Sequence, residues 1–377
     1  MNKIEKLINK LCPDGVEYKE LGKIWDRAPK SKLGVNKIKT LKNGNIICFT
    51  SGSKNHMIDD YLVDGEYIFV NDGGIADFKY NKGKAYYTDH VFAFGINTTD
   101  INAKFIYYLL LSKQAFINKS MFQGTTLKNL KKNDFANLLL PIPPISIQKK
   151  IVKILDKFTE LETDIETKIE TELKLRKKQY EYYRNQLLTP VEINSKWYLN
   201  SKEVELKELE QSGVNIFSGK NKKRDDKGKY NVYGSTGIIG KTNNYIYDKE
   251  QILIARVGSA GFVNIAKGKY DVSDNTLIVQ IINENEIKFK FLYYLLIFLK
   301  LNQFAKGAAQ PLITASQIKK LKIPVPPISE QNRIAIILDK FTELEIKLEK
   351  ELEKELKLRK KQYEHYREKL LTFKKKK

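Results

Sequence analysis

The feature that most constrains the fold of this chain is a stretch of sequence that occurs twice. The letters ILDKFTELE stand at Ile154–Glu162 and again at Ile337–Glu345. The match extends outward: PIPPISIQKK, which begins at Pro141, returns as PVPPISEQNR from Pro324, and ELKLRKKQYE follows in both copies. Weaker similarity continues upstream, so we interpret the whole chain as a tandem duplication. Each copy has a divergent part followed by a nearly invariant part.

The length of the chain favours two domains over one. A chain of 377 residues exceeds the usual size of a single core, and 42% hydrophobic residues suffice for packed interiors. The divergent parts keep ordered apolar patterns. We therefore expect them to do two different jobs, while the invariant parts do one job twice.

The invariant part predicts a long amphipathic helix in each copy. Its proline-rich entrance suits the start of a helix, where Ser146 and Ser329 are the expected N-caps. No Gly or Pro follows until Leu188 and Leu371, and apolar residues recur at spacings of three and four. We expect the two apolar stripes to bury against each other as an antiparallel coiled coil. The alternative, in which each helix packs only on its own domain, stays open.

The divergent parts predict an α/β (α+β) fold. Short apolar or alternating runs such as NIICFTSG, EYIFVNDG and QILIARVG end in Gly, Asn or Asp and indicate strands, and each copy then has a helical stretch. The expected domains are 1–145, which includes a short N-terminal helix, and 204–328. The long helices are expected at 146–189 and at 329–377, the latter with a basic tail, and a linker is expected at 190–203.

The composition disfavours membrane and zinc proteins. No apolar run is long enough to cross a membrane. The start of the chain, with apolar residues at Ile4, Leu7, Ile8 and Leu11, is amphipathic rather than a secretory signal, so we expect a cytoplasmic protein. Two cysteines and three histidines argue against a zinc site.

The sequence offers no convincing motif for catalysis. The Pro-Pro pairs follow Ile142 and Val325 and lack the polar residue that an amino-methyltransferase motif needs. No glycine-rich cofactor loop follows a strand, and there is no Walker motif. PDGVEYK at Pro13–Lys19 has the letters of a nuclease motif, but Asp14 and Glu17 are too close together to lie on the usual pair of strands. We therefore predict a binding protein with no catalytic and no metal-binding residues.

The net charge of +22 points to a polyanionic partner. The alternative is that the lysine enrichment reflects a biased composition, since Ile and Asn are also abundant. A membrane surface is less favoured, because the basic residues are dispersed and only Lys374–Lys377 form a pure basic run. We favour nucleic acid as the partner.

Loops at the ends of strand-like runs supply candidate base contacts. Arg256 in ILIARVGSAG, with Ser259 on the same loop, carries a guanidinium suited to guanine. The equivalent stretch of the first copy has Asn71 and Asp72, which suit adenine and cytosine. Different residues at equivalent loops would mean two different base readings. A structural ion pair of Arg256 is the alternative, and both interpretations stay open.

Basic and hydroxyl-bearing segments supply further candidate contacts to DNA, mainly to phosphates. One is GKNKKRDDKGK from Gly219, and two others, QGTTLKNLKK and KGAAQPLITASQIKK, precede the proline-rich segments. For the last two stretches, helix capping is an equal alternative. The candidates are Lys54, Lys220, Lys222, Lys223, Arg224, Thr125, Lys128, Gln310 and Thr314.

Jointly, several of these motifs resemble a known family. LCPDGVEYKELG near the start, GTTLKNL before PIPPISIQKKIVKILD, RKKQYEYYRNQLL at the end of the helix, and the second copy are similar to specificity subunits of type I restriction-modification systems over essentially the whole chain. The resemblance implies two target recognition domains, each reading one half of a split site in double-stranded DNA, and an antiparallel helical spacer. It implies no catalysis by this chain, with S-adenosylmethionine, ATP and Mg²⁺ expected on partner subunits only.

The resemblance also implies that methyltransferase subunits dock on the conserved helices and that restriction subunits join for cleavage. Two matched helices predict two methyltransferase subunits for each chain, and two unlike domains predict an asymmetric, bipartite DNA site. Two alternatives stay open: a coiled-coil adaptor or structural basic protein, and a separate specificity chain for a single-polypeptide restriction-modification enzyme. The expected docking residues are Phe158, Leu161, Tyr180, Tyr183, Phe341, Leu344, Tyr363 and Tyr366.

Overall fold

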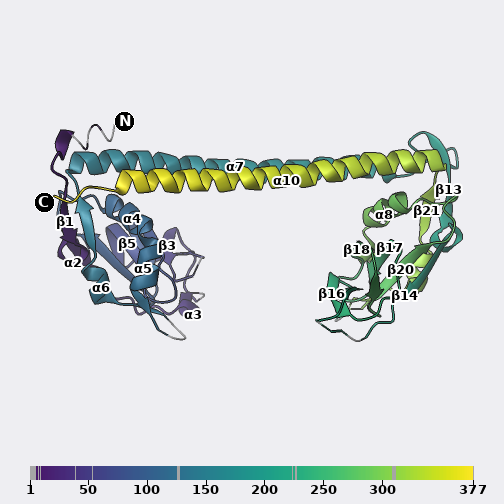
Figure 1. The fold of residues 1–377 in the computed structure, drawn as a ribbon, viewed down its shortest axis with the longest axis horizontal. Helices are drawn as coiled ribbons and strands as arrows, with labels where there is room; N and C mark the ends of the chain where they lie inside the picture. The colour runs from purple at the N-terminus through teal and green to yellow at the C-terminus, as the bar shows by residue number, and fades with distance from the viewer. Residues whose placement is uncertain are drawn as a thin grey trace. The chain divides into compact units, whose positions relative to one another are not determined.

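The computed structural model divides the chain into two compact units (Figure 1). Unit 1 comprises Met1–Ile169 and Glu353–Lys377, and unit 2 comprises Glu170–Leu352. Each unit therefore contains part of both long helices. The structure describes residues 6, 8, 10–38, 40–52, 54–124, 128–222, 224–225, 227–307 and 311–376.

Unit 1 is built on a six-stranded sheet with the order β2-β7-β5-β6-β3-β4. Neighbouring strands are antiparallel except β3 and β6, which are parallel. Helix α4 (Ala103–Ser112) buries Phe105 and Leu109 in a core shared with the apolar residues of the sheet. The strands are β2 (Trp25–Arg27), β3 (Ile46–Phe49), β4 (His56–Ile58), β5 (Val63–Asn71), β6 (Phe78–Tyr87) and β7 (Val91–Ile96).

A second, two-stranded sheet of unit 1 joins the early part of the chain to the entrance of the long helix. In it, β1 (Glu17–Glu20) pairs antiparallel with β10 (Leu139–Ile142). Short elements fill the remainder of the unit. They are α2 (Leu21–Ile24), α3 (Val35–Ile38), α5 (Gln114–Ser120), β8 (Phe122–Gln123), β9 (Asn129–Leu130) and α6 (Lys132–Ala136).

The C-terminal tail packs into unit 1. Phe373 is buried in the core of this unit, its carbonyl accepts a hydrogen bond from the Tyr18 hydroxyl at 2.9 Å, and Lys375 forms a bridge with Val16. The tail is therefore part of the fold rather than only a basic appendage. Of the expected N-terminal helix, residues 6, 8, 10 and 11 are helical, and Ile4 and Leu7 lie outside the described residues.

Unit 2 has the same arrangement of a sheet covered by a helix as unit 1, but two smaller sheets replace the six-stranded sheet. A four-stranded antiparallel sheet has the order β14-β20-β17-β18, and a three-stranded sheet has the order β16-β15-β19. Helix α8 (Phe289–Phe298) buries Phe291 and Leu295 in the core. The strands are β14 (Val214–Ser218), β15 (Tyr230–Gly234), β16 (Gly237–Thr242), β17 (Gln251–Ala255), β18 (Val263–Ala266), β19 (Tyr270–Val272) and β20 (Thr276–Ile281).

The segment expected to be a linker, 190–203, is ordered as strands. It forms β11 (Val191–Ile193) and β12 (Lys196–Leu199) and enters β13. These join a second four-stranded sheet of unit 2, with the order β11-β12-β13-β21. The pairing of β13 (Lys202–Glu208) with β21 (Lys322–Val325) is the counterpart of the β1–β10 pairing in unit 1. The short elements are η1 (Leu209–Gln211), η2 (Leu301–Phe304) and α9 (Ala315–Lys319).

The two long helices are α7 (Ile145–Leu188) and α10 (Ile328–Leu371), each of 44 residues. Each begins one residue before the expected start. Ser146 and Ser329 therefore lie inside the first turn, so the expectation that they are N-caps is wrong. No helix within the described part of the chain combines the length and apolar character that a bilayer crossing requires.

In unit 1, the first half of α7 packs antiparallel against the last half of α10. The ring of Phe158 stacks on Tyr366 with centroids 5.9 Å apart and meets Tyr363 edge-on at 6.2 Å. Further along α7, Glu166 forms an ion pair with Lys360 at 2.6 Å. Since rising numbers on α7 meet falling numbers on α10, the two segments run in opposite directions.

In unit 2, the remaining halves repeat this packing. The ring of Phe341 stacks on Tyr183 with centroids 5.5 Å apart and meets Tyr180 edge-on at 6.4 Å, and Lys177 lies 3.6 Å from Glu349. The expected antiparallel pairing is therefore confirmed within each unit. The alternative, in which each helix packs only on its own domain, is excluded.

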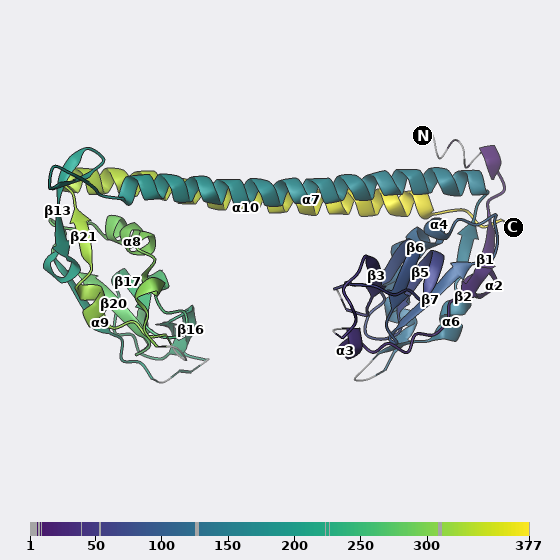
Figure 2. The same cartoon turned by 180° about the vertical axis from the view of Figure 1, so that it is seen from behind.

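The same polar joint connects the sheet-covering helix to the long helix in both units, and Figure 2 shows α4 and α8 beside the helix pair. In unit 1, the Tyr108 hydroxyl donates to Asp156 at 2.6 Å. The buried side chain of Gln148 accepts from the main-chain nitrogen of Asn102 at 2.8 Å and donates to the Pro143 carbonyl at 2.7 Å. These bonds fix α4 against the start of α7.

In unit 2, the Tyr294 hydroxyl donates to Asp339 at 2.6 Å. Gln331, also buried, accepts from the main-chain nitrogen of Lys288 at 2.8 Å and donates to the Pro326 carbonyl at 2.9 Å. The two glutamines are the same letter of the repeat. Their invariance thus has a structural reason, because each side chain satisfies main-chain groups that would otherwise be buried without partners.

Candidate nucleic-acid interface

In unit 2, four segments meet at one edge of the β14-β20-β17-β18 sheet. The main-chain nitrogen of Gly219, which begins the basic loop, donates to Thr276 at 2.9 Å. The main-chain nitrogen of Arg256, at the end of β17, donates to Asn275 at 2.9 Å, and the carbonyl of Arg256 accepts from Ile313 at 2.9 Å. These bonds bring the basic loop, the β17–β18 loop, the start of β20 and the segment before α9 together.

Arg256 is held by neutral groups. Its Nη1 donates to the Ser218 hydroxyl at 3.1 Å and to the Asp274 carbonyl at 3.0 Å. Its Nε is buried and has no hydrogen-bond partner among the described residues. The guanidinium is thus fixed at the loop edge by a hydroxyl and a carbonyl. These neutral partners differ from the structural ion pair that was the alternative interpretation of Arg256 in the sequence. Base reading by Arg256 and by Ser259, which is exposed, stays a prediction.

The basic loop between β14 and β15 exposes its cations. Lys220, Lys222 and Arg224 are all exposed, and Lys223 lies outside the described residues. Asn221 anchors this loop, because its side-chain nitrogen donates to the Asp271 carboxylate at 2.6 Å. An anchored main chain with exposed ammonium and guanidinium groups suits contact with phosphates.

The segment before α9 places Thr314 at a helix cap. The hydroxyl of Thr314 accepts from the main-chain nitrogen of Gln317 at 3.3 Å, and the side chain of Gln317 accepts from the main-chain nitrogen of Thr314 at 2.8 Å. This reciprocal pair is a capping box, which is the alternative that the sequence left open. Gln310 lies outside the described residues.

In unit 1, the corresponding edge is formed by the loop after β5. The main-chain nitrogen of Asp72 donates to His90 at 2.9 Å, and the carbonyl of Asp72 accepts from Leu130 at 3.0 Å. These are the same two main-chain bonds that Arg256 makes in unit 2. Asp72, rather than Asn71, is therefore the structural counterpart of Arg256. Its carboxylate lies 2.9 Å from the Lys132 ammonium.

Asn71 has a structural position. It is buried, with 4% of its surface exposed, and its side-chain nitrogen donates to the Ser51 carbonyl at 2.9 Å. Lys54 and Lys128 are exposed on neighbouring loops, and Thr125 lies outside the described residues. The exposed side chains of this edge thus include both lysines, whereas Asn71 is not among them.

The expected docking residues fall into two groups. Six are the aromatic residues that pack between α7 and α10 as described above. The other two, Leu161 and Leu344, are 45% and 62% exposed and occupy matching places in the two copies. A second matching pair, Leu175 and Leu358, is 55% and 53% exposed. This second pair was not among the expected docking residues, although the two leucines occupy the same place in the repeat.

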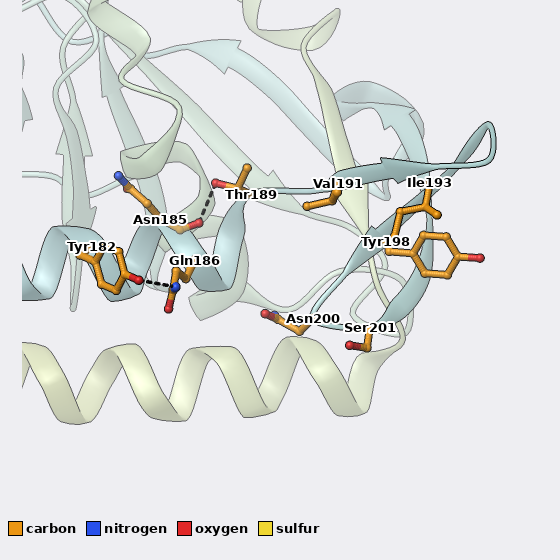
Figure 3. Close-up of a pocket in the computed structure, with 9 residues that line it drawn as sticks. All are labelled: Tyr182, Asn185, Gln186, Thr189, Val191, Ile193, Tyr198, Asn200 and Ser201. Atoms are coloured by element: carbon orange, nitrogen blue, oxygen red, sulfur yellow. Dashed lines mark hydrogen bonds between the residues drawn. The ribbon is translucent and has the colours of Figure 1, made fainter.

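An open pocket of about 840 Å³ lies in unit 2, between the end of α7 and the β11–β12 hairpin (Figure 3). The hydrogen bonds drawn in it are local: Gln186 donates to the Tyr182 hydroxyl at 2.7 Å, and the Thr189 hydroxyl donates to the Asn185 carbonyl at 2.6 Å. None of the lining residues is an acid, a base or a cysteine. The lining residues are Tyr182, Asn185, Gln186, Thr189, Val191, Ile193, Tyr198, Asn200 and Ser201.

This arrangement defines a class of protein with two duplicated recognition-type units, each with basic loops at a sheet edge and each tied to a paired long helix. The family model for the type I restriction modification DNA specificity domain matches residues 13–175 and 198–358, once in each copy. The chain belongs to the family of type I restriction-modification specificity subunits.

Similar proteins agree with this assignment. A protein of Haemophilus influenzae named as a type I restriction enzyme specificity subunit is 32% identical, over 95% of this chain and 96% of its own. The EcoprrI specificity subunit of Escherichia coli is 34% identical, over 64% of this chain and 61% of its own. A solved structure titled for complex assembly and conformational transition of the type I system has the same fold, with a TM-score of 0.72 at 14% identity, over 95% of this chain and 97% of its own.

Proposed function

We propose that this chain is the DNA-recognition subunit of a type I restriction-modification complex and that it binds an asymmetric, bipartite site in double-stranded DNA. One observation carries the proposal: the same main-chain position of the two units holds Asp72 in one and Arg256 in the other. A carboxylate and a guanidinium differ in both charge and hydrogen-bonding pattern, so equivalent loops that carry them cannot read the same base.

Exposed cations on these loops support DNA as the ligand. Lys54 and Lys128 in unit 1, and Lys220, Lys222 and Arg224 in unit 2, lie on segments joined to the Asp72 and Arg256 loops. Cations beside a base-reading loop neutralise phosphates and set the orientation of a protein on the duplex.

Two methyltransferase subunits are the proposed partners on the helices, and restriction subunits join through them. The matching pairs of exposed leucines, Leu161 with Leu344 and Leu175 with Leu358, give each helix a similar apolar surface. In this proposal the chain itself is not catalytic. The partner subunits bind and use S-adenosylmethionine, ATP and Mg²⁺.

Methylome sequencing of a host that expresses this chain with its methyltransferase subunit tests the recognition part. The expected result is one methylated motif in two unlike halves, whereas a palindromic motif would contradict two different base readings. Binding of the assembled complex to that motif should weaken steeply as salt rises. A coiled-coil adaptor, by contrast, would keep its assembly and show no preference for the motif.

Native mass spectrometry of the complex tests the docking part. We expect two methyltransferase subunits for each chain, falling to one for Leu161→Glu and also for Leu344→Glu. Lys119→Glu, an exposed change on α5, serves as the charge control. A single bound subunit in the unaltered complex at saturating partner concentration would refute the stoichiometry.

A further inference from the structure

An exposed isoleucine stands on the loop between β5 and β6. Ile75 leaves 67% of its surface in solvent. A single exposed apolar residue is ordinary on a protein surface and by itself indicates no function. The Ile75 loop differs, because hydrogen bonds from separate segments hold its main chain on both sides of Ile75.

Three contacts fix the loop. The main-chain nitrogen of Gly74 donates to the Lys128 carbonyl at 2.7 Å. On the other side, Ala76 is fully buried, its nitrogen donates to the Asn118 side chain at 2.6 Å, and its carbonyl accepts from the Gln114 side chain at 2.6 Å. The loop is therefore built to present the Ile75 side chain in a fixed place.

The surroundings of Ile75 are open and include an exposed cation. At Gly74, where φ is +84°, an added Cβ atom would meet nothing within 4 Å, so this part of the loop faces open space. Lys128, whose carbonyl anchors the loop, is exposed beside it. A fixed apolar side chain next to a cation suits a ligand that offers both anionic groups and an apolar group.

Unit 2 presents a large apolar residue from the equivalent loop. Phe262 is 51% exposed and precedes β18. At Gly261, whose φ is +88°, the loop packs directly against the main chain of Asn302. An added Cβ atom would lie 2.2 Å from the main-chain nitrogen of Asn302. Both units thus fix the loop that follows the Asp72 or Arg256 position and leave an apolar side chain outside.

We infer that Ile75 contacts the 5-methyl group of a thymine in the half-site that unit 1 reads. This inference rests on the proposed DNA-recognition function. In the major groove, the thymine methyl is the apolar group that base edges offer, and aliphatic side chains recognise it by contact. Because the loop is already ordered, binding loses little conformational freedom, and removal of the methyl from water is a net gain.

The test is a cycle between protein and DNA. The probes are duplexes carrying the methylated motif in which each thymidine in turn is replaced by 2′-deoxyuridine, which lacks only the methyl group. They are titrated with the assembled complex containing the unaltered chain or Ile75→Ala. We expect one position, in one half-site, to weaken binding by roughly four-fold for the unaltered chain, as loss of one buried methyl group predicts. The Ile75→Ala complex should bind that duplex and the parent duplex equally.

Two matched variants complete the design. Ile282 directly follows β20, at the end of that strand away from the loop edge, and is 69% exposed. Ile282→Ala therefore removes an equally exposed side chain and should leave all affinities unchanged. Phe262→Ala should leave the sensitive position intact and affect only the other half-site.

The possible outcomes distinguish failure of the thymine contact from failure of the proposed DNA-recognition function. No deoxyuridine effect at any position, or an effect that persists in Ile75→Ala, overturns the thymine contact while leaving DNA recognition standing. Equal loss by Ile75→Ala on motif and unrelated DNA also overturns it. Brightening of 2-aminopurine beside the site, lost in Ile75→Ala, would show that the side chain unstacks bases instead. If the unaltered complex shows no motif preference, the proposed function itself fails.

Discussion

Asp72 and Arg256 make the same pair of main-chain hydrogen bonds in two different units, although their side chains carry opposite charges. Asp72 is joined to His90 and Leu130, and Arg256 to Asn275 and Ile313, at 2.9–3.0 Å. The duplication thus preserved the main chain of this loop edge while its side chains diverged. We expect the specificity of each unit to be separable by mutation.

The first prediction concerns Arg256. Arg256→Ala removes the guanidinium, whereas Ser218→Ala removes one of its anchors and leaves the guanidinium in place. If Arg256 reads a base, Arg256→Ala should relax specificity at one position of one half-site by about 1–3 kcal/mol, and Ser218→Ala should change it much less. The measurement is competitive binding against single-base variants of the motif. Equal effects of the two changes would assign Arg256 to loop positioning.

The second prediction concerns the joint between the short and long helices. Tyr108→Phe and Tyr294→Phe each remove a hydroxyl that donates at 2.6 Å to an aspartate, Asp156 or Asp339. Burial, together with the neighbouring carboxylate, raises the pKa of both tyrosines, so each hydroxyl stays protonated as the donor. Each change should lower the free energy of unfolding by about 1–2 kcal/mol, measured by urea denaturation.

The control for this joint is Tyr182→Phe, because Tyr182 is 58% exposed at the surface of α7. It should change stability little. A large effect of Tyr108→Phe with none of Tyr294→Phe would show that the two joints differ in energy despite their matching geometry.

The third prediction concerns helix pairing. Phe158 and Tyr366 stack with an interplanar angle of 8°, and Phe341 and Tyr183 do so at 13°. A double-mutant cycle with alanine at Phe158 and Tyr366 should give a coupling energy of about 0.5–1.5 kcal/mol. The cycle at Phe341 and Tyr183 should give a similar value. Additive losses in both cycles would mean that the rings contribute through burial alone.

The fourth prediction concerns pH. The Glu330 carboxylate is buried and accepts from Arg333 at 2.7 and 2.8 Å, and these bonds hold its pKa below the usual range. A carboxyl group with a lowered pKa in the folded state stabilises the fold above its unfolded pKa, and the contribution is lost as pH falls through the folded pKa. Because Arg333 is half exposed, solvent screens the pair.

Glu330→Gln should therefore cost about 1 kcal/mol at pH 7. This difference from the unaltered protein should shrink as pH falls below about 4. Urea denaturation at pH 7 and pH 3.5 measures it. The repeat places Ile147 at the corresponding position of the first copy, so the effect belongs to unit 2. A difference that stays constant across this range would show that the carboxylate charge contributes nothing.

The fold could be anticipated from the sequence in most respects. Helix formation depends on residues three and four apart, so the apolar spacing gave both long helices to within one residue at each start. Two matched apolar stripes also gave the antiparallel pairing. The segment 190–203 was harder, since two-stranded hairpins of mixed polarity resemble a linker until their partner strands are known.

The candidate interface was harder to predict from the sequence than the fold. Reading along the chain, Asn71 and Asp72 were equal candidates, and only the pairing of β5 with β7 separated a buried Asn71 from the loop residue Asp72. Likewise, the sequence alone did not show which groups Thr314 and the aromatic residues of the long helices would contact. In the structure, Thr314 caps a helix by a hydrogen bond with Gln317, and the aromatic residues pack against the opposite helix.

The sequence by itself determined the duplication, the helices, the class of fold and the family, because these follow from local periodicity and from motifs with fixed spacing. Tertiary structure alone decided which side chains remain available to a ligand. A side chain is available to a ligand only if hydrogen bonds and packing between distant segments have not already used it. Ile75 is exposed and its loop is fixed because two other places in the chain, helix α5 with Gln114 and Asn118 and the segment at Lys128, hold the main chain on either side of it.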